Sequence, residues 1–515
     1  MTKTKPSLVL ITVDCLRADH CGFYGYARPT TPFLDSLASG SVVVPTAVIA
    51  GAPTYYSLPA ILASRMPLAL GREVVGLAPA EDTLATAIRE AGYATAAFSA
   101  ANPYISPRFG YDRGFDLFRD FLDFDAPETP AAAAAEPPAN KRLRGTLNRW
   151  LKSSAQAVGL NTLYDELYFQ YCVRVAARPA QTTDALRKFP SAGIVVEAAE
   201  SWLASLDSRP FFLWIHLMDP HSPYYPTGAA FEQLTGRKAS PNRARYLNEF
   251  WNRSDLPASR FERHKQAVGD LYDAGIRGVD TQIARLVGLL KSLNRWDNCA
   301  VAFTADHGEE FLEHGRRYHA PVSLTETIAR VPLLIRAPGQ DRTHAAAMPW
   351  GPQAVGLSGT GMVFSHLDLA PTLLEILGVP PPAAFQGTSL WRRLRQEPAS
   401  NIPVNHDPAN HAIAECVYGC TNPFNAQTLL SARLLSVREA RYKLVIRLAP
   451  GAVEELYDLV ADPGEKIPLT GRETAEIRGR LLRIALEHVK KTTAARPDAV
   501  RLRGRLRALR LKLQP

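Results

Sequence analysis

The chain has 515 residues, of which 46% are hydrophobic and 21% are charged, a composition that excludes disordered, fibrous and membrane-spanning classes of protein. Its formal net charge is +9, but much of the excess lies in KRLRGTLNRWLK at 141–152 and RLRGRLRALRLK at 501–512. Because the rest of the chain is closer to neutral, we expect no nucleic-acid partner. The two basic stretches could instead touch an anionic membrane surface peripherally, or remain solvated.

The cysteines and the N-terminal residues bear on the cellular compartment. Six cysteines are scattered along the chain without a CxxC pair or a zinc-finger spacing, which favours free thiols in a reducing compartment. The N-terminal apolar run is short, ends at an acidic residue and lacks the cleavage site of a signal peptide. No stretch of ~18 consecutive apolar residues occurs. We therefore expect a cytoplasmic protein.

Strand and helix patterns alternate along most of the chain. The first expected strand, Ser7 to Val13, is almost wholly apolar, as in a strand buried on both faces of a parallel sheet. Further segments follow at 31–39, 84–91, 94–99, 192–206, 210–217, 271–293, 299–304 and 331–335. Alternation of this kind predicts an α/β layer fold.

Composition divides the chain further. Residues 125–140 are rich in Pro, Ala and Glu, and a basic helical pattern follows, so we interpret 125–190 as an insertion that could form a lid. From about 396 the strands become shorter, and a helix is expected at 473–490. The prediction is a catalytic domain over 1–395, a smaller α+β C-terminal domain over 396–490 and a basic tail over 491–515.

Asp306 and His307 follow the apolar run Val301 to Phe303 in VAFTADHGEEFLEHG. Neighbouring residues on a strand point to opposite faces, so both can aim at one metal only where the strand has ended. The carboxyl ends of strands are also where ligands bind in open α/β sheets. Asp14 ends the first strand in the same way, and the three side chains suit Mg²⁺, Mn²⁺ or Zn²⁺. Capping aspartates and a surface histidine are the alternative interpretation.

Two further segments carry candidate chemistry. Thr54 precedes an apolar helical run, where a hydroxyl would meet free N–H groups and the positive end of the helix dipole. Bound to a metal, it could attack phosphorus or sulfur, although a plain N-cap is the commoner role of threonine. His216 and His221 lie in HLMDPHSPY after a third apolar strand, where a histidine can contact an anionic ester or protonate a leaving oxygen.

These residues, taken in order, resemble the alkaline phosphatase–sulfatase superfamily and its sulfatase-like branch. The matching stretches run from about 7 to 466 and include VDCLRADHCGFYGYARPTTPFLDSLA, APTYYSLPAIL, SAANPYISPRFGYDRGFD, HLMDPHSPY, TADHGEEFLEHG, RVPLLIRAPG, HLDLAPTLLEILG, QGTSL and ELYDLVADPGE. The resemblance implies a three-layer α/β/α alkaline-phosphatase-like sheet domain with a smaller α+β C-terminal domain.

The resemblance also implies roles for individual residues. It makes Thr54 the nucleophile, places His221 and His319 on the anionic group of the substrate, and places Asn102 near the ester. His216 remains a second candidate for contacting or protonating the substrate. The implied metal ligands are Asp14, Thr54, Asp306 and His307.

Two departures from the sulfatase pattern narrow the function. Thr54 stands where sulfatases of the formylglycine type carry an oxidisable Cys or Ser, and Leu58 replaces the arginine of that motif. Cys15 replaces the second aspartate of the usual pair, and a thiol is a poor ligand for Ca²⁺ or Mg²⁺. The remaining set resembles phosphoglycerol and phosphoethanolamine transferases, so one divalent metal is expected, with Mn²⁺ or Zn²⁺ favoured over Mg²⁺ or Ca²⁺.

We therefore expect a metal-dependent hydrolase or transferase of phosphate, phosphonate or sulfate esters, most of all a phosphodiesterase. The substrate would be a small-molecule or lipid-headgroup anionic ester. One alternative is a sulfate-ester hydrolase that works without formylglycine. The other is a family member that binds an anion without turnover.

Overall fold

The computed structural model describes residues 5–69, 76–124, 150, 153–154, 160–173, 180–339, 362–396, 410–420, 432–448 and 453–492. Most of the expected insertion at 125–190, nearly all of the two basic stretches and nearly all of the tail at 491–515 lie outside these residues. The predictions of a lid and of peripheral membrane contact therefore stay predictions. Among the described helices, none is long and apolar enough to cross a bilayer.

A seven-stranded sheet forms the centre of the molecule, in the order β2-β11-β7-β1-β6-β4-β5. The strands β7, β1, β6, β4 and β5 run parallel, whereas β11 is antiparallel to β7. Their bounds are β1 Ser7–Val13, β2 Val42–Val43, β4 Ala94–Ser99, β5 Leu117–Arg119, β6 Phe211–Leu217, β7 Cys299–Ala305 and β11 Leu333–Arg336.

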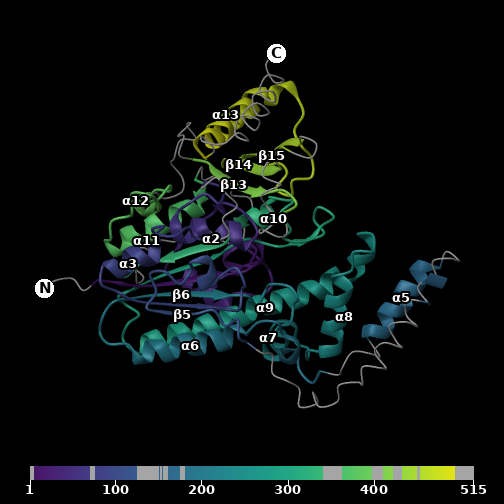
Figure 1. The fold of residues 1–515 in the computed structure, drawn as a ribbon, viewed down its shortest axis with the longest axis horizontal. Helices are drawn as coiled ribbons and strands as arrows, with labels where there is room; N and C mark the ends of the chain where they lie inside the picture. Colours follow the sequence, from purple (N-terminus) through teal and green to yellow (C-terminus); the bar gives the residue numbers. More distant parts are fainter. Residues whose placement is uncertain are drawn as a thin grey trace.

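Helices cover both faces of this sheet, so the predicted three-layer α/β/α class is confirmed (Figure 1). On one face lie α6 (Ala192–Ser205) and α9 (Ser259–Ser292); on the other lie α2 (Thr54–Ala63), α3 (Leu84–Glu90) and α11 (Leu369–Leu377). The remaining helices are α1 Pro32–Ala38, α5 Asn161–Tyr171, α7 Gly228–Thr235, α8 Pro241–Trp251, α10 Glu326–Ala329 and α12 Trp391–Gln396. Short strands complete the domain: β3 Ala47–Val48, β8 Glu310–Phe311, β9 Arg317–Tyr318, β10 Arg330–Val331 and β12 Phe364–Ser365.

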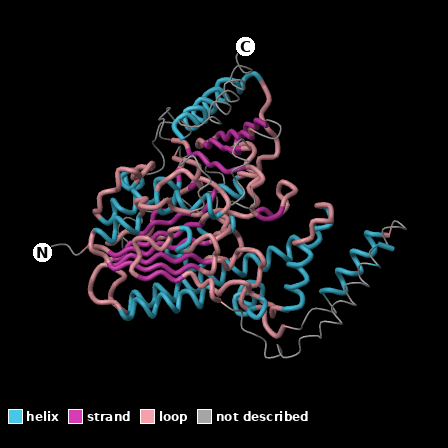
Figure 2. Tube along the Cα trace, in the orientation of Figure 1, coloured by secondary structure: helices cyan, strands magenta, loops and turns pink. Residues whose placement is uncertain are grey.

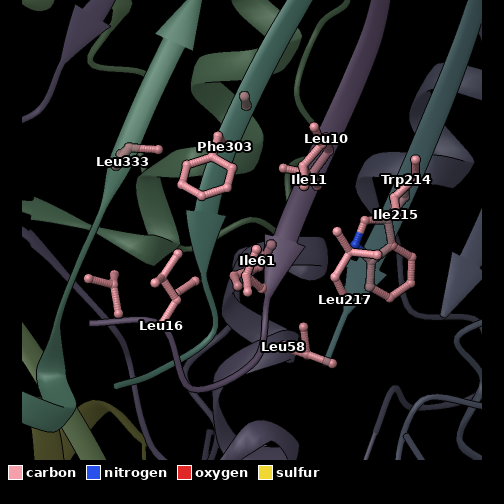
Figure 3. Packing of buried hydrophobic residues seen from close by; sticks show 14 of the residues in the cluster. Leu10, Ile11, Leu16, Leu58, Ile61, Trp214, Ile215, Leu217, Phe303 and Leu333 are labelled. Atoms are coloured by element: carbon pink, nitrogen blue, oxygen red, sulfur yellow. The ribbon is translucent and has the colours of Figure 1, made fainter. Parts of the chain in front are cut away.

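The main core includes residues of the sheet, of α6 and α9 on one face and of α2 on the other. Strands β1, β6 and β7 are buried along their whole length, as their apolar runs predict. Figure 3 shows Leu58 and Ile61 of α2 beside the ends of these strands. This packing fixes α2 against the sheet, and its first residue, Thr54, with it.

Two elements differ from the sequence-based expectation. The helix expected at 271–293 begins at Ser259, because Phe261 and Val268 extend its buried stripe through an otherwise charged segment. The strand expected at 331–335 is split between β10 and β11, with Pro332 between them. Proline has no N–H to donate to a ladder, so the segment pairs with two different sheets.

The C-terminal residues form an antiparallel sheet of four strands, β13 Ala412–Val417, β14 Arg433–Arg438, β15 Tyr442–Arg447 and β16 Val453–Asp458. Helix α13 (Ala475–Thr492) packs on this sheet around a second apolar cluster that includes Leu435, Leu444 and Leu482 (Figure 2). A smaller α+β unit is therefore present, as predicted. Its expected start at 396 adjoins 397–409, outside the described residues, and that boundary stays a prediction.

Candidate functional site

Four neighbouring parallel strands, β7, β1, β6 and β4, bring the predicted site residues to one edge of the sheet. Asp14 follows β1 directly, and its N–H donates to Leu217 O at the end of β6 (2.8 Å). Asp306 follows β7, and its N–H donates to Val13 O (3.3 Å). Each aspartate therefore sits one residue past its strand, where the backbone is still held by the ladder but is free to turn.

The residues predicted as metal ligands lie together. Thr54 is the first residue of α2, and its Oγ1 lies 3.4 Å from Asp14 Oδ2 and 3.3 Å from His307 Nε2. His307 Nε2 is 3.6 Å from Asp14 Oδ1 and 3.7 Å from Asp306 Oδ2. The Nδ1 of the same ring lies 2.9 Å from Gly308 O, which leaves Nε2 facing the carboxylates. All four side chains are buried.

His216 and Asn102 also face Asp14. Asn102 Nδ2 donates to Asp14 Oδ2 (3.0 Å), and His216 Nε2 lies 3.6 Å from the same oxygen. His216 belongs to β6 itself, and Thr12 Oγ1 on the adjacent strand lies 2.9 Å from its Nδ1. This contact fixes the ring so that Nε2 points into the site.

Three imidazole rings line the other side of the cluster. The centroid of His319 is 4.6 Å from that of His307 and 5.1 Å from that of His221. Glu309 accepts from His319 Nδ1 (3.1 Å) and from the Tyr224 hydroxyl (3.0 Å). The structure thus brings all eight predicted site residues into one place, while their chemical roles stay predictions.

The charges in this cluster depend on one another. Burial alone would raise the pKa of Asp14, but His221, His216 and His307 outweigh it and hold that pKa well below its usual range. Burial and the neighbouring Asp14 carboxylate raise the pKa of Asp306.

The pKa values of His221 and His319 shift in opposite directions. Burial lowers the pKa of His221 more than Asp14 raises it. Burial would likewise lower the pKa of His319, but Glu309 outweighs it and raises the value to about 9. At neutral pH, His319 is therefore a cation that can meet an anionic group.

The residues fit a divalent cation. Within the described residues, three groups have ligand atoms within 4.8 Å of one another: Cys15 with His307 and His319, Asp14 with Cys15 and His221, and Asp14 with His216 and Asp306. Two buried atoms that face the centre, Asp306 Oδ2 and His216 Nε2, have no hydrogen-bond partner. Unpaired buried polar atoms are costly, and a bound cation would satisfy both.

Glu309, Tyr224 and Tyr272 are parts of the site that the sequence analysis missed. Tyr272, in the middle of α9, accepts from Arg17 N (3.0 Å) and donates to Cys15 O (2.7 Å). The pair of glutamates after Asp306-His307 was a weak signal for Glu309. Tyr224 ends the stretch HLMDPHSPY, which was a weak signal of the same kind, whereas the sequence offered none for Tyr272, because its partners lie far away in the chain.

Sequence profiles of two known families match most of the chain. The profile described as Sulfatase matches residues 6–379. The profile described as N-sulphoglucosamine sulphohydrolase, C-terminal, matches residues 318–491.

Curated relatives are similar at low identity. Arylsulfatase K of Xenopus laevis is 25% identical over 308 residues, which cover 55% of this chain and 53% of the relative. The multifunctional alkaline phosphatase superfamily protein PehA of Trinickia caryophylli is 26% identical over 227 residues, which cover 40% of this chain and 41% of the relative. An arylsulfatase of Clostridium perfringens is 26% identical over 415 residues, covering 75% and 78%. The chain thus spans about half or less of the first two relatives and over three quarters of the third.

Solved structures share the fold over nearly the whole chain. A 2-O GAG sulfatase has a TM-score of 0.61 at 19% identity, covering 95% of this chain and 92% of its own. The phosphonate monoester hydrolase of Agrobacterium radiobacter has a TM-score of 0.59 at 19% identity, and the match covers 95% of this chain and 96% of the hydrolase. At such identities the likeness establishes the architecture alone.

Proposed function

Because this chain belongs to the sulfatase family of the alkaline phosphatase superfamily, we propose that it is a metal-dependent ester hydrolase with Thr54 as its nucleophile. The observation that carries the proposal is the position of Thr54 Oγ1, at the start of α2 and within 3.4 Å of both Asp14 and His307. A hydroxyl there lies beside the ligand set and at the positive end of a helix dipole.

We assign phosphate and phosphonate esters as the preferred substrates, phosphodiesters among them. An unmodified threonine offers no aldehyde hydrate from which sulfate could be eliminated. A relative named as a multifunctional member of the alkaline phosphatase superfamily is compatible with substrates other than sulfate esters. The arylsulfatases among the relatives keep sulfate-ester hydrolysis as the second candidate. Transfer to an acceptor alcohol in place of water is compatible with the same site.

One divalent ion, with Mn²⁺ or Zn²⁺ favoured, completes the proposed centre. The residues that would hold it are Asp14, Thr54, Asp306 and His307. When bound, such an ion lowers the pKa of a hydroxyl and polarises an ester oxygen. The unpaired Asp306 Oδ2 and the two carboxylates sharing one buried space support this assignment.

The side chains around the proposed metal would carry out the attack, the stabilisation of charge and the protonation of the leaving group. Thr54 Oγ1 forms a bond to phosphorus or sulfur, and its proton passes to solvent. His221, Asn102 and the first turn of α2 stabilise the charge that develops on the ester oxygens. The bond to the leaving oxygen breaks, and a histidine protonates that oxygen. Water or an alcohol then displaces Thr54 from the covalent intermediate and restores its hydroxyl.

His319 is the better candidate for the proton donor. Its side chain is 17% exposed, so it can meet the leaving group at the open side of the site, whereas His216 is wholly buried. The pKa of about 9 keeps His319 protonated at neutral pH. If His319 is the proton donor, His216 instead orients the Asp14 carboxylate.

The test compares Thr54→Ala with Thr54→Ser, both loaded with metal, on aryl sulfate, phosphate monoester, phosphate diester and phosphonate ester substrates. We expect Thr54→Ala to lose at least about 10³-fold in kcat while its melting temperature stays close to wild type, because the nucleophile is removed. Thr54→Ser keeps a hydroxyl and should retain measurable turnover. Full activity of pure Thr54→Ala would contradict the assignment, and a purified protein without bound metal or turnover would favour an anion-binding role.

A further inference from the structure

Cys15 is held in an uncommon backbone conformation beside the metal ligands. Its φ is 62°, in the left-handed region that residues with a Cβ rarely adopt. Its N–H donates to Asp306 Oδ1 (3.3 Å), and its carbonyl accepts from the Tyr272 hydroxyl (2.7 Å). Strain of this kind persists only where surrounding contacts determine the geometry, and it occurs most often at functional positions.

That backbone directs the sulfur toward charged and polar groups. Cys15 Sγ lies 3.1 Å from Asp14 Oδ1 and 3.2 Å from His319 Nδ1. A structural buried cysteine, by contrast, behaves as a small apolar side chain. Cys21 is such a residue, because it belongs to the main apolar cluster and its Sγ lies 3.6 Å from a backbone carbonyl, Arg17 O.

The spacing of the atoms suits a shared ion. In a tetrahedral zinc site with the usual bond lengths to S, N and O, adjacent ligand atoms lie roughly 3.5 Å apart. The distance from Cys15 Sγ to Asp14 Oδ1 is 3.1 Å, and the distances from His307 Nε2 to Asp14 Oδ1 and Asp306 Oδ2 are 3.6 and 3.7 Å. Cys15 belongs to two of the three groups whose ligand atoms lie within 4.8 Å of one another.

A second observation points to the same ion. Asp306 Oδ2 and His216 Nε2 are wholly buried and have no hydrogen-bond partner. Both belong to the set that contacts Asp14, the carboxylate next to Cys15 in the chain. Asp14 therefore belongs to one group with the thiol and to another with both unpaired atoms.

We propose that the Cys15 sulfur is a direct ligand of the metal and that the site thereby selects a thiophilic ion, Zn²⁺ in the first place, over Ca²⁺ and Mg²⁺. On binding, the S–H bond breaks, its proton passes to solvent, and a sulfur–metal bond forms. Thiolates favour zinc, whereas Ca²⁺ and Mg²⁺ require oxygen ligands. The inference rests on the proposed function only in assuming that this cluster holds a metal.

Absorption spectroscopy tests the inference without an activity assay. Protein loaded with one equivalent of Co²⁺ or Cd²⁺, as counted by mass spectrometry, should show a sulfur-to-metal charge-transfer band. We expect Cys15→Ser to lose the band, and Cys21→Ser, the matched control, to keep it. A wild-type protein that binds one equivalent without the band, or a Cys15→Ser protein that keeps it, would overturn the inference.

A second variant reverses the proposed selectivity. Cys15→Asp replaces sulfur with oxygen donors, and its affinity for Zn²⁺ relative to Ca²⁺ should fall at least about tenfold, measured by competition against a metal indicator. An unchanged ratio would also overturn the inference. The proposed function fails separately, through full activity of Thr54→Ala. A Thr54-dependent enzyme whose bound metal shows no sulfur band would therefore refute only the role of Cys15.

Discussion

Lys443 is a wholly buried cation between the C-terminal sheet and α10. Its Nζ lies 3.1 Å from Glu326 and 2.8 Å from Glu465, and Arg438 lies 3.4 Å from the same Glu326. We expect Lys443→Met to lower the free energy of unfolding by about 3–5 kcal/mol, because the buried Glu465 loses its cationic partner and Glu326 keeps only its arginines. The exposed Lys188 offers a control, and Lys188→Met should stay within about 0.5 kcal/mol of wild type. Urea denaturation measures both, and equal midpoints for the two variants would contradict the prediction.

The same cluster makes stability depend on pH. Burial alone would raise the pKa of Glu326, but Arg438, Lys443 and Arg330 outweigh it and lower the value to about 2. Because an unfolded glutamate titrates at about 4.3, the unfolded state binds the proton first as the pH falls. The contribution of Glu326 is therefore complete above that pH and is lost as the pH approaches 2. We expect the unfolding free energy of wild type to fall more steeply across this window than that of Glu326→Gln. Urea denaturation at a series of pH values measures both, and an equal pH dependence of the two unfolding free energies would refute the assignment.

At the scale of single residues, the sequence predicts what lies at the end of a strand. Asp14 and Asp306 follow buried apolar runs, so their convergence follows from the geometry of a parallel sheet. Glu309 and Tyr224 could not be predicted in the same way, because their hydrogen bond joins segments with no shared pattern. Nor does the sequence show that Cys15 adopts a positive φ, or that its carbonyl accepts from Tyr272 on a helix far along the chain.

Helix α9 approaches the loop before His221 with no room for a side chain. A Cβ placed on Gly275 would lie 2.6 Å from Asp219 O, a backbone atom that cannot move without shifting the loop. We expect Gly275→Ala to lower both the melting temperature and the activity, although alanine is favoured over glycine in a helix. Differential scanning fluorimetry and the ester assays measure the two effects.

Two other glycines of α9 provide the matched controls. A Cβ on Gly269 or Gly288 would meet nothing within 4 Å. Gly269→Ala and Gly288→Ala should therefore raise the stability by up to about 1 kcal/mol each, because the substitution removes only the conformational cost of glycine. A Gly275→Ala protein as stable and as active as these two variants would show that neither stability nor activity needs the close approach to Asp219.

At the scale of elements, periodicity predicts existence and type better than boundaries. Charged residues interrupt the apolar periodicity at the beginning of α9, so the sequence predicts its start at 271 rather than at Ser259. The strand around Pro332 is one apolar run in the sequence but two strands in the structure, because its two halves pair with different partners. Pairing partners are decided by tertiary contacts, which local propensity does not contain.

For the whole molecule, the C-terminal sheet is joined to the catalytic domain by buried contacts. Glu415 on β13 is wholly buried, and its N–H and side chain bind Ala50 O (2.8 Å) and Leu68 N (3.0 Å). The Tyr55 hydroxyl, one residue after Thr54, donates to Cys420 O (2.8 Å). We expect a single thermal transition, with calorimetric and van't Hoff enthalpies in agreement, rather than one for each unit. Two separate peaks in the calorimeter would contradict this prediction.

The place of β1 in the central sheet has a consequence for how the chain is made. This first strand pairs on one side with β6, through Leu8 and Phe212, and on the other with β7, through Ser7 and Cys299. A ribosome therefore releases a continuous apolar strand long before either neighbour exists, and both of its edges stay open to other chains in the meantime. We therefore expect β1 to need protection during synthesis, by a chaperone or by transient local contacts, until β6 and β7 have been made.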